Sequence, residues 1–178
     1  MRLRPLAVDG AFVVEPERHA DERGYFARAF DADAFAEHGL ESAVAQTSVS
    51  FNVKELTLRG LHYQAAPHAE AKLVRCTRGA VYDVVVDLRP QSPTFLRWDA
   101  VQLDEDDGLG AYVPPGCAHG FLTLRDASEL HYQISAPYQP EAARGVRWDD
   151  PAFGIDWPAA PRVIAARDAS YPDFAPDR

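Results

Sequence analysis

The sequence predicts an all-β protein of the sandwich or barrel type, with the jelly roll as the natural arrangement. Short apolar segments recur along the chain at near-regular spacing, and clusters of Pro, Gly, Asp and Ser separate them. The segment 80–88 alternates clearly, since Val81 and Asp83 share one face while Tyr82 and Val84 share the other. Many short strands with few helical segments are typical of a jelly roll.

The predicted strands share this short length and the turn residues at their ends. They cover residues 11–15, 44–50, 55–64, 72–78, 80–88, 95–103, 110–114, 119–125 and 128–136. Two turn clusters separate the strands most sharply, at 89–93 and 104–108. We therefore expect antiparallel sheets built from neighbouring short strands.

One helix is predicted, over residues 30–40. Asp31 or Asp33 can cap its first turn, Phe35 and Leu40 supply apolar contacts, and Gly39 suits its end. The helix is short, so the fold class stays all-β with a few short helices.

A single domain over residues 1–178 is expected, because the chain has one domain's length and shows no linker or repeat. The 47% hydrophobic and 25% charged residues are ordinary for a globular protein. Residues 137–178 are rich in Pro, Asp and Trp. We expect them to form a C-terminal wrapping segment with one short helix.

The net charge of −9 argues against nucleic-acid and anionic-membrane partners, which are bound by basic surfaces. No apolar run reaches the length of a signal or of a membrane span, so we expect a soluble, cytoplasmic protein. Cys76 and Cys117 lie in apolar strands without metal-type spacing and are predicted to be buried free thiols.

Several cations and histidines fall on predicted strands, where burial is costly unless the side chain is paired or used. They are Arg59, His62, Lys72 and His119. Strict alternation would place Arg59 and His62 on opposite faces, since they are three residues apart. We infer a bulge near Gly60 that turns one of them to the other face.

Six motifs occur in order along the chain: DERGYF (21–26), RGLHYQ (59–64), KLVRC (72–76), G-x-x-YDVVVDLR-x-x-SPTF (79–95), P-x-G-x-AHGF (114–121) and RGVRWDDP (144–151). With them the chain resembles the dTDP-4-dehydrorhamnose 3,5-epimerase family of deoxysugar biosynthesis over about residues 10–174. The resemblance implies a cupin-type jelly roll, a homodimer, and neither metal nor cofactor. It also implies a nucleotide-linked 4-keto-6-deoxyhexose as substrate.

Epimerisation of such a sugar needs a base on one face, an acid on the other and a donor for the enolate oxygen. The resemblance makes His62 the base, Tyr132 the general acid and Lys72 the enolate contact. Asp168 is the expected partner of His62. Asp83, which alternates with valines on its strand, is the alternative partner.

Substrate contacts are also implied by the resemblance. Arg23 and Arg59 suit the phosphates because a guanidinium binds an anion through two parallel hydrogen bonds, and Arg23 is expected to reach a neighbouring subunit's pocket. The remaining ligand-lining positions are Phe26, Gln46, His119 and Tyr138.

Three positions depart from the family pattern, Arg28, Ser48 and Pro137, and the first two leave the identity of the nucleotide open. Three alternatives exist within the family: inversion at both C3 and C5, inversion at one centre only, or action on a different sugar nucleotide. A metal-dependent cupin, suggested by His119, and a non-catalytic sugar-binding module are more distant alternatives.

Overall fold

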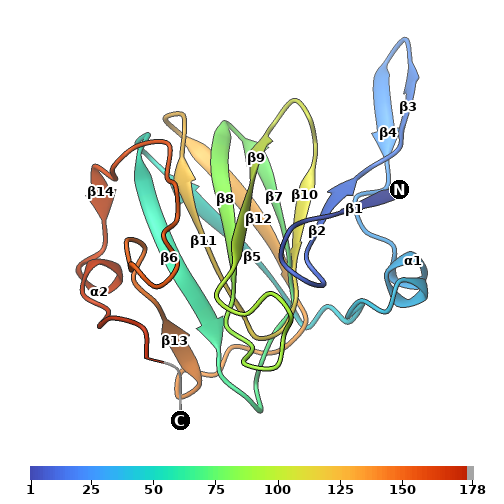
Figure 1. The fold of residues 1–178 in the computed structure, drawn as a ribbon. Coiled ribbons are helices and arrows are strands. Elements are labelled where there is room, and N and C mark those ends of the chain that lie inside the picture. Colours follow the sequence, from blue (N-terminus) through green and yellow to red (C-terminus); the bar gives the residue numbers. More distant parts are fainter. Residues whose placement is uncertain (176–178) are drawn as a thin grey trace.

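The computed structural model describes residues 1–175 as two antiparallel β-sheets that face each other, with a separate hairpin projecting from the body (Figure 1). Two short helices complete the fold: α1 (Ala32–Glu37) near the N-terminal end and α2 (Ala166–Ala169) near the C-terminal end.

The first sheet has six strands in the order β1-β2-β10-β7-β12-β5. Their bounds are β1 Arg2–Pro5, β2 Phe12–Glu15, β10 Gly110–Val113, β7 Lys72–Arg78, β12 Ser128–Ile134 and β5 Gln46–Asn52. Strand β5 therefore lies at one edge of this sheet and β1 at the other.

The second sheet runs β13-β6-β11-β8-β9, with β14 added in parallel to β6. Its strands are β13 Ala143–Gly145, β6 Thr57–Gln64, β11 Cys117–Thr123, β8 Ala80–Asp87, β9 Trp98–Asp104 and β14 Val163–Ile164.

The main core lies between the two sheets. Val74 and Leu130 of the first sheet pack with Leu103 and Phe121 of the second, and all four are at most 1% exposed. Burying such side chains stabilises the sandwich by about 2 kcal/mol each. The prediction of an all-β fold with a few short helices is confirmed.

Residues 137–175 cover the outer face of the second sheet. Val146 and Phe153 pack there against Leu61 and Val84, and Trp157 packs at the border of this cluster. The segment contains the short strands β13 and β14 and, as expected, one short helix. Because α2 follows β14, it is held beside β6.

The structure corrects the predicted helix and reveals a hairpin that the sequence pattern did not indicate. Helix α1 spans 32–37 rather than 30–40; Asp31 caps it, accepting a hydrogen bond from the Ala34 amide. Strands β3 (Arg18–Asp21) and β4 (Gly24–Ala27) form the projecting hairpin. Most of its residues are exposed on both faces, so no alternation of apolar and polar residues marks it.

The predicted bulge near Gly60 is present. His119 pairs with His62 but Phe121 pairs with Arg59, so β6 carries one extra residue between the two pairs. Gly60 has a φ of +128°, and a Cβ there would lie 2.6 Å from the Gly120 Cα. Glycine is therefore required at position 60, where it lets β6 and β11 approach closely.

Candidate active site

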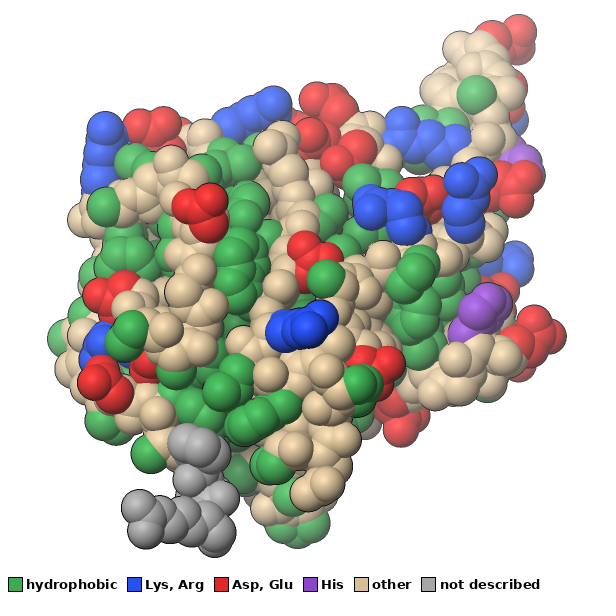
Figure 2. Space-filling view, viewed as in Figure 1, with side chains coloured by type: hydrophobic (Ala, Val, Ile, Leu, Met, Phe, Trp, Pro, Cys, Tyr) green, Lys and Arg blue, Asp and Glu red, His purple; other side chains and the backbone are tan. Residues whose placement is uncertain are grey.

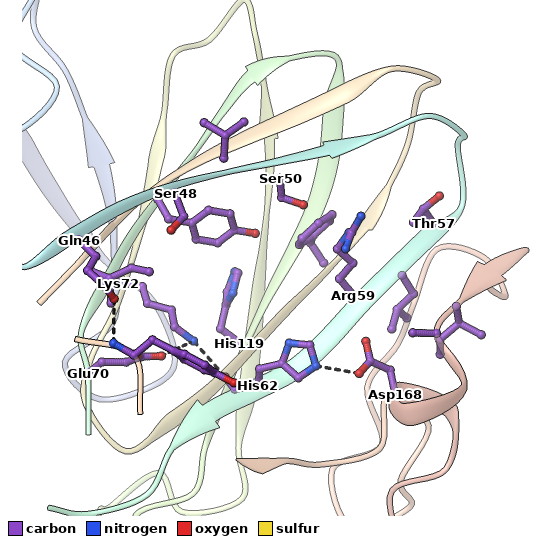
Figure 3. Close-up of a pocket in the computed structure, with 18 of the residues that line it drawn as sticks. Gln46, Ser48, Ser50, Thr57, Arg59, His62, Glu70, Lys72, His119 and Asp168 are labelled. Carbon is purple, nitrogen blue, oxygen red and sulfur yellow. Dashed lines mark hydrogen bonds and ion pairs between the residues drawn. The ribbon is translucent and has the colours of Figure 1, made fainter. Parts of the chain in front are cut away.

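A pocket of about 610 Å³ lies between the sheets, within the size range of small-molecule sites. Both sheets and the C-terminal segment contribute to its lining (Figure 3). The predicted site residues in the lining are Gln46, Arg59, His62, Lys72, His119, Tyr132, Tyr138 and Asp168.

His62 and Asp168 form a hydrogen-bonded pair in this pocket. The His62 Nε2 lies 2.8 Å from Asp168 Oδ1, and the other carboxylate oxygen accepts the Gly60 amide at 3.1 Å (Figure 3). Burial alone would raise the pKa of Asp168, but these bonds, and the charge that His62 carries when it is protonated, hold that pKa below its usual value. Asp168 is therefore ionised at neutral pH.

The Asp168 carboxylate fixes the tautomer of His62. A carboxylate accepts a hydrogen bond, so Nε2 carries the proton and Nδ1 keeps its lone pair. The side chain of His62 is 43% exposed and lines the pocket, whereas that of Asp168 is 6% exposed. A neutral imidazole held in this way can take up a proton as a general base.

Tyr132 enters the same pocket from the opposite sheet, on β12, whereas His62 is on β6. Burial raises the pKa of the Tyr132 phenol, and the charge of Asp83 raises it further. The hydroxyl therefore keeps its proton at neutral pH and can donate it.

Lys72 is buried at 8% exposure and points into the pocket from β7 (Figure 3). Its ammonium lies 3.1 Å from Glu70 Oε1 and donates to the His62 carbonyl at 3.2 Å. Glu70, which sequence reasoning did not select, also lines the pocket. The pair places a cation beside His62.

Asp83 is the partner of His119 and does not contact His62. Its Oδ2 lies 2.8 Å from His119 Nε2, and both side chains are at most 4% exposed. The His119 ring meets Tyr132 edge-on, with 6.0 Å between centroids. Of the two predicted partners for His62, the geometry selects Asp168.

Arg59 lies across the bulge from His62 and lines the same pocket. Its Nε donates to Asn52 Oδ1 at 2.7 Å, and Asn52 is 2% exposed. Sequence reasoning missed Asn52, which orients this guanidinium. At the pocket rim, Gln46 Oε1 accepts the Tyr138 amide at 2.8 Å.

Arg23 and Phe26 lie on the projecting hairpin, outside this pocket. The Arg23 side chain, 84% exposed, is paired with Asp21, and Phe26 is 70% exposed. Within one chain the structure does not bring them to the other predicted site residues.

The remaining structural findings concern metals, thiols and membrane helices. Within residues 1–175, no cluster of three or more His, Cys, Asp or Glu side chains could hold a metal ion. Cys76 and Cys117 are buried free thiols, as predicted, and burial raises their pKa values to about 11 and about 12. No helix in the described part of the chain is long and apolar enough to cross a membrane.

Comparison with known proteins agrees with this geometry. The family model of dTDP-4-dehydrorhamnose 3,5-epimerase matches residues 5–176. The chain is 40% identical to the dTDP-4-dehydrorhamnose 3,5-epimerase of Sinorhizobium fredii, over 98% of this chain and 90% of that protein. It is 41% identical to the dTDP-4-dehydrorhamnose 3-epimerase of Streptomyces niveus, over 94% of this chain and 81% of that one.

A solved structure extends the similarity to the fold. The dTDP-4-dehydrorhamnose 3,5-epimerase of Elizabethkingia anophelis superposes with a TM-score of 0.94 at 35% identity, covering 98% of this chain and 96% of that one. Sequence, fold and the ordered motifs agree over nearly the whole chain. The protein therefore belongs to the dTDP-4-dehydrorhamnose 3,5-epimerase family, a family of sugar-nucleotide isomerases.

Proposed function

We propose that the protein inverts both C3 and C5 of a dTDP-linked 4-keto-6-deoxyhexose, with His62 as base and Tyr132 as acid. The observation that supports this most is their arrangement: an imidazole fixed by Asp168 and a protonated phenol enter one pocket from opposite sheets. Proton removal on one face and return on the other is what inversion requires.

The C4 carbonyl acidifies the hydrogens on C3 and C5. Nδ1 of His62 takes one of these protons, and the electron pair moves onto the C4 oxygen to give an enolate. Lys72 donates a hydrogen bond to that oxygen. Tyr132 then protonates the same carbon from the opposite face, and Asp168 stabilises the imidazolium meanwhile.

The pocket suits the anionic part of such a substrate. Arg59 lines the pocket and is held by Asn52 and by a longer bond of 3.5 Å to the Phe51 carbonyl, so the N–H groups that make neither bond are available to a diphosphate. Gln46, His119 and Tyr138 would contact the rest of the ligand. The net charge of −9 does not prevent diphosphate binding, because inside a cleft the attraction comes from a nearby cation and the more distant charges are screened.

Inversion at a single centre is the second candidate function, since a relative named a 3-epimerase is about as similar to this chain as those named 3,5-epimerases. Incubating the protein with dTDP-4-keto-6-deoxyglucose in D₂O and locating the label by NMR separates the two. Deuterium at both C3 and C5 is expected. Label at one centre only would refute double inversion.

We propose further that the protein is a homodimer in which Arg23 and Phe26 reach the partner's pocket. The hairpin that bears them projects from the body (Figures 1 and 2). Strand β5 bounds the pocket and exposes Val49 at 62% and Phe51 at 46%, and Val53, the residue that follows the strand, is 66% exposed. A second chain would cover both surfaces.

Light scattering coupled to gel filtration tests this assembly. A mass near twice 19.7 kDa is expected, with weaker substrate binding in Arg23→Ala. A monomer with full activity would contradict the proposal.

A cytoplasmic location stays a prediction, consistent with a pathway that consumes sugar nucleotides. Fractionation of cells producing the protein would test it.

A further inference from the structure

We infer that Glu70 is a positioning residue that pairs with the Lys72 ammonium and orients it for the reaction; the inference rests on the proposed role of Lys72. Glu70 precedes β7 and lines the active-site pocket, with its side chain 10% exposed. Its Oε1 lies 3.1 Å from the Lys72 ammonium (Figure 3). No role in the proposed chemistry has so far been given to this carboxylate.

Glu70 supplies the negative charge that the buried Lys72 ammonium needs. Lys72 is 8% exposed, and a buried ammonium is stable only when an opposite charge and hydrogen bonds replace water. Its second partner, the His62 carbonyl at 3.2 Å, is neutral. Among residues 1–175, Glu70 provides the only ion pair that Lys72 makes.

Glu70 also helps to set the direction of the Lys72 ammonium. An ammonium has three N–H groups, and Glu70 and the His62 carbonyl occupy two of them. Lys72 lines the pocket, so the third N–H is left for a ligand. The two contacts also tie Lys72 to the backbone of the residue that acts as base. The enolate oxygen would therefore form beside His62, where the proton is removed.

Glu70 has an opposing effect, because its negative charge lies near the oxygen that becomes negative. Lys72 separates the two anions, which weakens this repulsion. Removing the carboxylate, by contrast, leaves the buried ammonium without a counter-ion and with one contact fewer, which favours movement of the Lys72 side chain toward water. An ammonium that has moved away stabilises the enolate far less well, so the loss of position outweighs the relief of repulsion.

The test uses Glu70→Gln, which keeps the shape of the side chain and removes its charge. We expect kcat for solvent deuterium exchange to fall roughly 10- to 100-fold, while KM changes by less than about threefold, because Lys72 acts mainly in the transition state. Glu70→Asp, which keeps the charge at greater distance, should lose less. Glu15→Gln, which breaks the Arg4 pair on the β1–β2 edge at 3.2 Å, is the matched control and should keep full activity.

A double-mutant cycle separates positioning from a general structural role. If Glu70 acts through Lys72, the double variant Glu70→Gln with Lys72→Met should be no slower than Lys72→Met alone. Thermal unfolding of each variant verifies that it is folded.

Three results would overturn the inference. They are an unchanged or higher kcat in Glu70→Gln, a loss confined to KM, or independent losses that multiply in the double variant. These results differ from failure of the proposed function, in which the wild-type protein itself exchanges no deuterium; the role of Glu70 would then fall with it.

Discussion

Replacing Asp168 by Asn tests the assignment of the base most sharply, because it removes one charge and keeps the size of the side chain. When His62 takes a proton, the imidazolium and the Asp168 carboxylate attract each other across a hydrogen bond of 2.8 Å. With charge centres ~4 Å apart and an effective dielectric constant of ~20, the attraction is about 4 kcal/mol. His62 is 43% exposed, so solvent screening reduces this energy to about 2–3 kcal/mol.

The expected result is a decrease in kcat of roughly 30- to 150-fold, with a smaller change in KM. Initial rates of deuterium exchange into the sugar, followed by NMR, measure it directly. Asp33→Asn, on the exposed side of α1, removes the same charge far from the pocket and should leave the rate unchanged. A kcat for Asp168→Asn within about twofold of wild type would refute the proposed stabilisation of the imidazolium.

Three further predictions follow from single contacts. Tyr132→Phe should lower the rate of inversion by ~10²-fold or more, yet keep measurable proton exchange on the face of the sugar that His62 serves. An equal loss of inversion and of proton exchange would contradict the role of Tyr132 as acid. Gly60→Ala should cost about 3 kcal/mol of unfolding free energy, because its φ is +128° and its Cβ would meet the Gly120 backbone; an unchanged urea midpoint would disprove the strain. Burial would raise the pKa of Asp87, but hydrogen bonds from Arg89, Ser92 and Thr94 outweigh it and lower that pKa from 3.8 to about 2. The ionised carboxylate therefore stabilises the fold above pH ~4, and this stabilisation is lost as the pH falls through 2. Wild type should lose about 2 kcal/mol more than Asp87→Asn between pH 4 and pH 2, measured by denaturant unfolding, and parallel losses would rule this out.

The sequence predicted most strands of the two sheets because their apolar side chains are buried, in β8 on both faces. The alternation around Val81 and Val84 fixes which side chains enter the core. The three-residue spacing of Arg59 and His62 also predicted the bulge, since both had to face one ligand. By contrast, the β3–β4 hairpin is exposed on both faces. Its sequence therefore lacks the alternation of apolar and polar residues by which a strand of a packed sheet is recognised.

The site was predicted less completely because its contacts join distant segments. Asp168 lies 106 residues from His62 in sequence; the family resemblance predicted this partner, whereas the residues alone left Asp83 open until the folded C-terminal segment placed Asp168 at His62. Glu70 was missed because it lies just before a strand, where a carboxylate is ordinarily solvated. Only the structure shows that Glu70 is nearly buried and paired with Lys72.

The central claim is that the His62 imidazole removes a proton from carbon. Replacing His62 by Gln keeps the bulk of the side chain and removes the base, and NMR in D₂O then measures exchange of the hydrogens next to the sugar carbonyl. Exchange at C3 and exchange at C5 should both fall by ~10³-fold or more in a variant that remains folded. Exchange that continues at the wild-type rate at either carbon would contradict it.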